Sequence, residues 1–247
     1  MSYPTPAHPV ADLVPKRRSV RDFRPDPIPQ DLLDALLASA NQAPSWANTQ
    51  PYRIAVASGA MRDQLATELC ARFDAGMRAQ QSGWLGRLRL LVKPGGMPDG
   101  DFSTTFEYPA DLQVARRATG HGLYSLLGIA RSDHAARNSQ MRRNFEFFGA
   151  PTVIFLFIHG GLHEFAVLDA GIWLQTLMLS APALGLDTCA QGALATWGGP
   201  VRAAFEVPKG YKLMCGAAIG YASGHLINQY TPGRPDHRLL QLAPKKA

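Results

Sequence analysis

A short basic segment near the N-terminus holds the side chains best suited to bind a phosphate group. Within five residues it contains three guanidinium groups and a hydroxyl, from Arg17, Arg18, Ser19 and Arg21. Such groups side by side can surround a dianionic phosphate with charge-assisted hydrogen bonds. The alternative is an ordinary surface segment in which Arg18 or Arg21 pairs with Asp22 or Asp26.

A loop rich in amide groups follows about 25 residues later. Residues 43–51 read Ala-Pro-Ser-Trp-Ala-Asn-Thr-Gln-Pro, with prolines near both ends. Amides beside an indole suit the imide and carbonyl edge of a flat heterocycle. Two alternatives remain open at this point. Trp46 is also well suited to packing at a subunit interface, and Asn48 and Gln50 can instead satisfy the backbone of a tight loop.

Common catalytic signatures are missing from the chain. It contains no GxxxxGK[ST], GxGxxG, GxSxG or HExxH. His159 and His163 are four residues apart, but Gly160 and Gly161 break the helix that such metal ligands need. We therefore expect a turn that caps the next helix at this point, and no metal site.

The charge balance points to an anionic partner. The chain of 247 residues has 25 Lys and Arg against 19 Asp and Glu, a net charge of +6, and 19 of the 25 cations are Arg. Arginine is favoured where planar, bidentate contact with phosphate or carboxylate is needed. A basic nucleic-acid-binding protein using the stretch 116–143 is one alternative. The interspersed acids and the scarcity of aromatic residues there favour a solvated helix face with ion pairs instead.

Cysteine usage and hydropathy indicate a soluble cytoplasmic protein without a membrane anchor. The three cysteines are widely spaced, as expected for reduced thiols, and no secretory signal opens the chain. The apolar segment 165–186 contains Asp169, Gln175 and Pro182. An unpaired aspartate in lipid is costly, so we expect a helix buried in a protein core or a subunit interface.

Periodicity predicts one α+β domain over residues 1–247. Apolar residues at helical spacing, or in strand-length runs, predict helices near 10–17, 32–40, 59–73, 114–147 and 165–184 and strands at 52–57, 153–158 and 212–219. Helices and a few strands without regular βαβ alternation are typical of the α+β class. Three less regular segments complete the prediction: a loose N-terminal arm at 1–9, a loop-rich excursion at 81–113 and an extended C-terminal arm at 225–247.

Several motifs in a fixed order carry a resemblance to a known family. They are Arg17-Arg18-Ser19-Val20-Arg21, the loop 43–51, Leu184-Gly185-Leu186-Asp187-Thr188-Cys189 and Gly220-Tyr221. Together they resemble the FMN-dependent nitroreductase family from about residue 11 to 240, and the long excursion resembles its larger nitrobenzoate-reductase-like subgroup. The resemblance implies a central mixed sheet flanked by helices, an intertwined homodimer and one FMN in each of two interface sites.

The resemblance also implies which residues hold the cofactor. The phosphate would be bound by Arg17, Arg18, Ser19 and Arg234, while Arg21 would face the N1–C2=O edge of the flavin. The isoalloxazine would be partly covered from the other subunit by Pro44, Ser45, Trp46 and Asn48. Gln191 and Gly192 would lie near flavin N5, although relatives commonly have an acid in place of Gln191.

The activity implied by the resemblance is the reduction of a small aromatic nitro compound. NADH or NADPH would supply hydride, the nitro group would become nitroso and then hydroxylamine, and a single slot used twice would give ping-pong kinetics. No dedicated acid or base residue is needed, because the flavin carries the chemistry. The alternatives are a quinone or enone reductase, or a flavin-modifying relative on the same scaffold.

Overall fold

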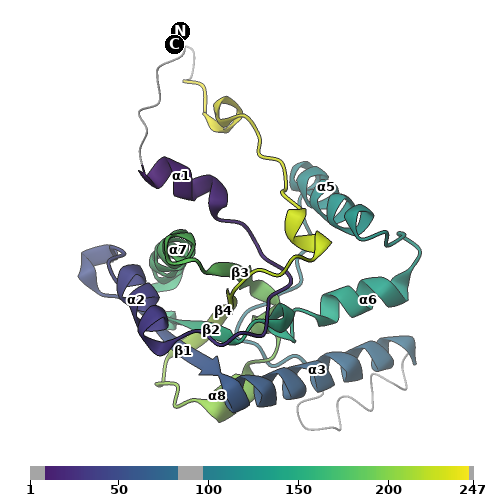
Figure 1. Ribbon diagram of the computed structural model, residues 1–247, viewed down its shortest axis with the longest axis horizontal. Coiled ribbons are helices and arrows are strands. Elements are labelled where there is room, and N and C mark those ends of the chain that lie inside the picture. The colour runs from purple at the N-terminus through teal and green to yellow at the C-terminus, as the bar shows by residue number, and fades with distance from the viewer. Residues whose placement is uncertain (1–8, 83–96, 245–247) are drawn as a thin grey trace.

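The computed structural model describes residues 9–82 and 97–244, and its centre is a four-stranded sheet with helices on both faces (Figure 1). The strands are β1 (Tyr52–Ser58), β2 (Thr152–His159), β3 (Asp187–Gln191) and β4 (Tyr211–Gly220). They lie in the order β1-β2-β4-β3, and neighbouring strands are antiparallel. Within the described ranges, parallel pairing is confined to an isolated bridge between Ser19 and Thr188. The α+β class is confirmed, but the four described strands form an antiparallel sheet and not the mixed sheet that the resemblance implied.

Strand β2 is central because it has apolar side chains on both faces. Its residues alternate between two cores: Val153, Phe155 and Phe157 face one, and Ile154 and Leu156 face the other. A strand buried on both faces carries such a continuous apolar run. The three strands predicted from the sequence fall within β1, β2 and β4, and β3 is the short edge strand that the sequence left unassigned.

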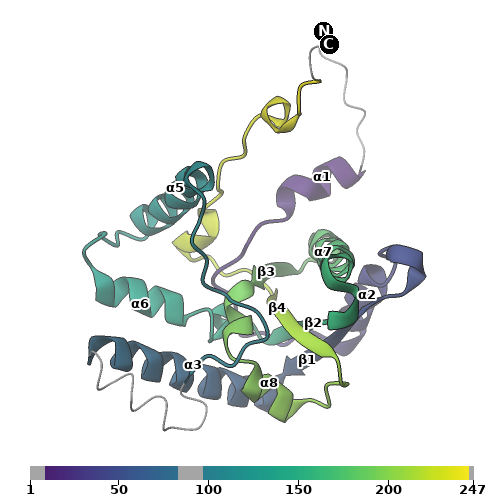
Figure 2. The same cartoon turned by 180° about the vertical axis from the view of Figure 1, so that it is seen from behind.

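Two layers of helices cover the sheet (Figures 1 and 2). On one face, α2 (Gln30–Ala40) and α7 (His163–Ser180) bury Leu36, Trp173 and Leu177. On the other, α3 (Gly59–Gln81) and α8 (Gly198–Ala204) bury Leu65, Leu69 and Val201. The edge strand β3 pairs with β4, and it is the strand beside the basic segment.

The remaining helices are peripheral, and their bounds differ from the prediction. They are α1 (Pro9–Lys16), α5 (Ala110–Leu126) and α6 (His134–Arg142). The excursion expected at 81–113 is shorter at its far end, because Ala110 already begins α5 after Pro109. Most of its first half, residues 83–96, lies outside the described residues.

The C-terminal arm returns past the sheet toward α5. It contains the short 3-10 turn η6 (Leu226–Gln229), and the Tyr230 hydroxyl donates to Thr119 O of α5 at 2.9 Å. In Figure 1 the arm then rises on the same side of the molecule as α1. Helix α1 and the described part of the C-terminal arm therefore lie on the same side of the sheet (Figures 1 and 2).

Candidate active site

The basic segment is fixed to the edge of the sheet by one buried residue. Ser19 forms the parallel bridge with Thr188, and Val20 N–H donates to Thr188 O at 3.1 Å. Val20 is fully buried. Because side chains alternate along an extended chain, Ser19 and Arg21 point away from the core.

A cavity of about 470 Å³ lies beside this segment. It is lined by five cations, from Lys16, Arg17, Arg18, Arg21 and Arg234. Its one carboxylate among the described residues is Asp187, which already accepts a hydrogen bond from Ala222 N–H at 3.1 Å. Across the ranges that the structure covers, none of the four arginines forms an ion pair. Uncompensated guanidinium groups around one cavity favour an anionic ligand.

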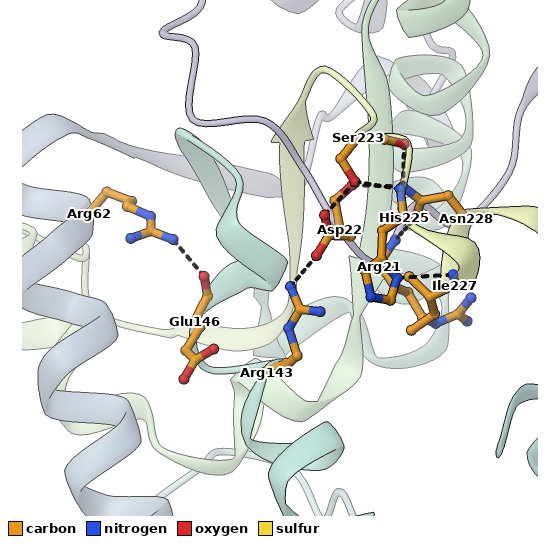
Figure 3. Close-up of polar contacts among 9 residues, drawn as sticks. All are labelled: Arg21, Asp22, Arg62, Arg143, Glu146, Ser223, His225, Ile227 and Asn228. Carbon is orange, nitrogen blue, oxygen red and sulfur yellow. Dashed lines mark hydrogen bonds and ion pairs between the residues drawn. The ribbon is translucent and has the colours of Figure 1, made fainter. Parts of the chain in front are cut away.

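Arg21 is held by a buried amide from the C-terminal arm. Its backbone N–H donates to Asn228 Oδ1 at 2.8 Å, and Asn228 Nδ2 donates to the carbonyl oxygens of Asp22 at 2.7 Å and Ser223 at 3.1 Å (Figure 3). Only 5% of Asn228 is exposed. Sequence reasoning missed this residue, because no local pattern separates it from other asparagines.

The carboxylate of Asp22 joins a third segment to this cluster. Arg143 donates to Asp22 Oδ2 at 2.6 Å, and the Ser223 hydroxyl donates to Asp22 Oδ1 (Figure 3). Burial raises the pKa of Asp22, but the hydrogen bonds from Ser223 and Arg143 outweigh it and hold this pKa below its ordinary value. The ionised form of Asp22 is therefore stabilised in the folded protein.

The aspartates after the basic segment are thus engaged elsewhere. Asp22 pairs with Arg143, and Asp26 pairs with Arg24 at 3.4 Å. The surface ion pairs that the sequence left open, between these aspartates and the cavity arginines, do not form among the described residues. The cavity arginines keep their charge available for a ligand.

Strand β3 leads from this cavity to a second one. Asp187, at the start of β3, lines the cationic cavity, and Gly192, directly after the strand, lines a larger cavity of about 1090 Å³. Five residues of strand span about 15 Å. A cationic pocket and a mainly apolar pocket therefore stand at the two ends of one short strand.

The expected position of Gln191 at this cavity needs correction. Its side chain is 2% exposed, and Nε2 donates to Asn144 O at 2.8 Å, while Oε1 has no hydrogen-bond partner in the described chain. Gln191 lines neither cavity. Because side chains alternate along a strand, the side chain of Gln191 points into the core. Of the two residues expected near flavin N5, only Gly192 lines the cavity.

The segment from Met97 to Tyr108 forms one wall of the larger cavity, and its first part is fixed in place. Gly100 N–H donates to Thr196 O at 3.1 Å. A Cβ atom on Gly100 would lie 1.9 Å from Ala195 O, so only glycine permits this approach. The wall is therefore docked against the chain that follows Gly192.

Comparison with known proteins identifies the family. Residues 14–221 match the model of the nitroreductase family. Nitroreductase NfnB of Mycolicibacterium smegmatis is 35% identical over 230 residues, covering 90% of each chain. A 4-nitrobenzoate reductase of Nocardioides sp. is 31% identical over 212 residues, covering 85% of this chain and 78% of the relative. The crystal structure of the FMN-dependent NfnB from Mycobacterium smegmatis in complex with NADPH superimposes with a TM-score of 0.81 at 31% identity, covering 96% and 98% of the two chains.

The chain belongs to the nitroreductase family. This membership confirms the resemblance inferred from the ordered motifs, and the nitroreductase fold confirms the predicted class. The structure brings Arg234 together with Arg17, Arg18 and Arg21, which lie more than 200 residues earlier in the sequence. Asp187, which belongs to one of the family motifs, lines the same cavity.

In this nitroreductase the amide-rich loop lies apart from both cavities. Pro44, Ser45, Trp46 and Asn48 line neither of them within one protomer. Ser45 Oγ accepts from Gln50 N–H at 3.0 Å, and the Gln50 and Asn48 amides bond each other. Trp46 N–H donates to the buried Asp169 of α7 at 3.1 Å. The loop is held locally, but the Trp46 side chain remains 63% exposed.

Helix α7 packs one face into the core and leaves an apolar face exposed. By length and composition alone, the segment Gly160–Leu184 around it passes as a membrane span. In the fold, α7 packs Trp173 against the sheet and buries Asp169. Phe165 and Leu168 remain 49% and 56% exposed, and the Phe165 ring lies 4.6 Å from the ring of Trp46.

Four arginines of the stretch 116–143 form ion pairs or ring contacts with other residues of the same chain. Arg142 donates to Asp74 at 2.9 Å, and Arg143 reaches Asp22. The guanidinium groups of Arg116 and Arg137 lie 4.8 Å and 5.1 Å from the ring centroids of Tyr108 and Tyr124. These cations stabilise the fold and do not present one continuous basic face.

His159, the last residue of β2, and His163, the first residue of α7, are joined by a short turn at Gly160–Leu162. His159 Nδ1 accepts a hydrogen bond from Gly161 N–H at 3.1 Å. Within the described residues there is no group of three side chains that could hold a metal ion. His159 therefore acts as a cap.

Proposed function

We propose that this protein is an FMN-dependent oxidoreductase that reduces nitroaromatic compounds with NAD(P)H. It acts as a cytoplasmic homodimer built from one domain per chain. The observation that carries the proposal is the pairing of two cavities along β3, one rich in unpaired arginines and one apolar. Such a pair suits a ligand with an anionic phosphate at one end and a flat aromatic ring at the other. Named relatives that are FMN- and NADPH-dependent support this assignment.

The chain's own residues then have defined roles toward FMN. Arg17, Arg18, Ser19 and Arg234 would hold the phosphate. The Arg21 guanidinium would place positive charge at the N1–C2=O edge, and Gly192 would offer its backbone N–H near N5. When bound, FMN supplies the two-electron chemistry between NAD(P)H and the acceptor. The protein supplies binding, orientation and a positive field.

The dimer is supported by exposed apolar side chains that a monomer would leave in water. Trp46 and Phe165 touch one another, and Leu168 lies on the same helix as Phe165. Clustered exposed aromatic and aliphatic side chains mark protein interfaces. In the dimer, Pro44, Ser45, Trp46 and Asn48 of each subunit would complete the flavin site of the other.

The cofactor assignment is tested by titrating the apoprotein with FMN. The double change Arg17→Ala and Ser19→Ala removes a charged and a neutral hydrogen bond to the phosphate, so we expect the dissociation constant to rise about 100-fold. Arg24→Ala is the matched control, because Arg24 is exposed and pairs with Asp26 outside the cavity. Unchanged FMN affinity in the double variant would refute the phosphate assignment.

The reaction is tested with the FMN-loaded wild-type protein. NAD(P)H oxidation should accelerate on addition of a nitroaromatic compound, with nitroso and hydroxylamine products identified by mass spectrometry. A flavin-loaded protein that oxidises NAD(P)H no faster with any nitroaromatic would overturn the proposed activity. Turnover with quinones alone would favour the alternative reductase.

A further inference from the structure

The described lining of the larger cavity consists largely of aromatic and methionine side chains and includes no charged side chain. Aromatic side chains and methionines dominate its lining, from Phe73, Phe102, Phe106, Phe145, Trp197, Met77, Met97, Met141 and Met214. Its polar side-chain groups are hydroxyls, an amide, a thiol and the indole N–H of Trp197. The lining that the structure describes contains no Lys, Arg, His, Asp or Glu. Thioethers and ring faces make favourable contacts with aromatic ligands.

The charged groups nearest in sequence to this wall are engaged with one another. Asp99 pairs with Arg72 at 3.2 Å, and Asp101 pairs with Arg202 at 2.5 Å. Asp101 also accepts a hydrogen bond from Leu213 N–H at 2.7 Å. These residues anchor the start of the wall and are absent from the cavity lining described above. They supply no cation for an anionic ligand.

Two of the hydroxyl groups that line the cavity already have a hydrogen-bond partner. Thr104 Oγ1 and Thr196 Oγ1 share a hydrogen bond of 2.9 Å. The buried Trp197 Nε1–H, by contrast, has no partner in the described chain. A carboxylate entering this cavity would lose its hydration without meeting a counter-ion among the described lining residues.

We infer that the acceptor site is selective for uncharged nitroaromatics over carboxylated ones, with Met77 among the residues that set this preference. The inference rests on the proposed function and concerns the cavity that Gly192 lines. It separates this protein from the relative named a 4-nitrobenzoate reductase, whose named acceptor is an anion. The net charge of +6 attracts anions to the surface generally, but selectivity is decided by desolvation inside the cavity.

The reaction at this site balances with the donor named above. In the first step, Ar–NO₂, NAD(P)H and H⁺ give Ar–NO, NAD(P)⁺ and H₂O. The nitro nitrogen gains two electrons and loses one oxygen as water, and the nicotinamide loses a hydride. The second step converts Ar–NO, NAD(P)H and H⁺ into Ar–NHOH and NAD(P)⁺. The aryl substituent takes no part in either step, so its charge acts through binding.

The test compares methyl 4-nitrobenzoate with 4-nitrobenzoate, which differ mainly in charge. Binding is measured by calorimetry on the oxidised, FMN-loaded protein without NAD(P)H, and kcat/KM is measured in steady state. We expect the ester to bind more tightly and to react with a kcat/KM about 30-fold higher than the acid, from the cost of desolvating an unpaired carboxylate. Equal or tighter binding of the acid would overturn the inference.

A cation introduced into the cavity should weaken the preference for the ester. Met77→Arg places a guanidinium in the lining, and we expect the ester-to-acid ratio of kcat/KM to fall about tenfold. Met61→Arg is the matched control, because Met61 lies on the same helix, is 42% exposed and does not line the cavity. Flavin content and the unfolding midpoint show whether each variant is folded.

The outcomes separate this inference from the proposed function. A protein that reduces both compounds equally well is a nitroreductase without the selectivity inferred here. A ratio that changes equally in Met77→Arg and Met61→Arg also overturns the inference, since surface charge would then explain it. A protein that binds FMN but reduces neither compound contradicts the proposed function itself, and with it the inference.

Discussion

Removal of the Asn228 side chain is the sharpest test of how the cationic cavity is built. One buried amide joins the basic segment to the C-terminal arm through three hydrogen bonds, at 2.8, 2.7 and 3.1 Å. In Asn228→Ala the Arg21 N–H and the carbonyls of Asp22 and Ser223 lose this partner. At about 1 kcal/mol net for each bond, we expect the free energy of unfolding to fall by about 3 kcal/mol.

The assay is urea unfolding of the apoprotein at a fixed protein concentration, with thermal melting in parallel. For a chain of 247 residues, about 3 kcal/mol corresponds to a lower melting temperature of roughly 6–12 °C. Asn41→Ala is the control. Asn41 is exposed and accepts one hydrogen bond, from Trp173 Nε1 at 3.0 Å, so its loss should cost only about 1 kcal/mol.

FMN adds a second readout to the same variant. A ligand that binds the folded state alone stabilises it according to its dissociation constant. If Asn228 positions Arg21, the stabilisation gained on adding FMN should be smaller in Asn228→Ala than in Asn41→Ala. A loss below about 1 kcal/mol in the apoprotein, with full FMN stabilisation retained, would refute the positioning role.

Two further predictions concern charge and assembly. Because the folded pKa of Asp22 lies below its ordinary value of 3.8, its ionised form should stabilise the protein above this pH, and the contribution should be lost as pH falls through the folded pKa. The difference in unfolding free energy between wild type and Asp22→Asn should therefore be constant near neutral pH and shrink in acid; a constant difference down to strongly acidic pH would contradict it. Leu168→Glu puts a charge on the 56% exposed apolar face of α7, so size-exclusion chromatography should show a monomer, while Met61→Glu on α3 should remain a dimer. A dimeric Leu168→Glu protein would place the interface elsewhere.

Much of the fold was accessible from the sequence because local patterns produced it. The apolar run 153–158 predicted the buried strand β2, and the spacing of the apolar residues at 32–40 predicted α2. The edge strand β3 was not accessible, because its five residues carry little periodicity and its pairing partner, Gly216–Gly220 of β4, is distant in the sequence. The long excursion was predicted too far toward the C-terminus, since Gly and Pro residues near 94–98 obscured where α5 begins.

The sequence by itself determined the kind of ligand, and only the tertiary structure decided how the residues meet it. Clustered arginines indicated an anionic ligand, because the chemistry of a side chain can be read locally, and the resemblance of the ordered motifs to the nitroreductase family implied FMN. The arrangement depends on contacts between residues 207, 121 and 47 positions apart in the sequence. The Asn228 side chain accepts a hydrogen bond from Arg21 N–H, and Arg143 forms an ion pair with Asp22. The buried Gln191 side chain donates a hydrogen bond to Asn144 O. Such contacts are set by packing of the whole chain, which no local pattern encodes.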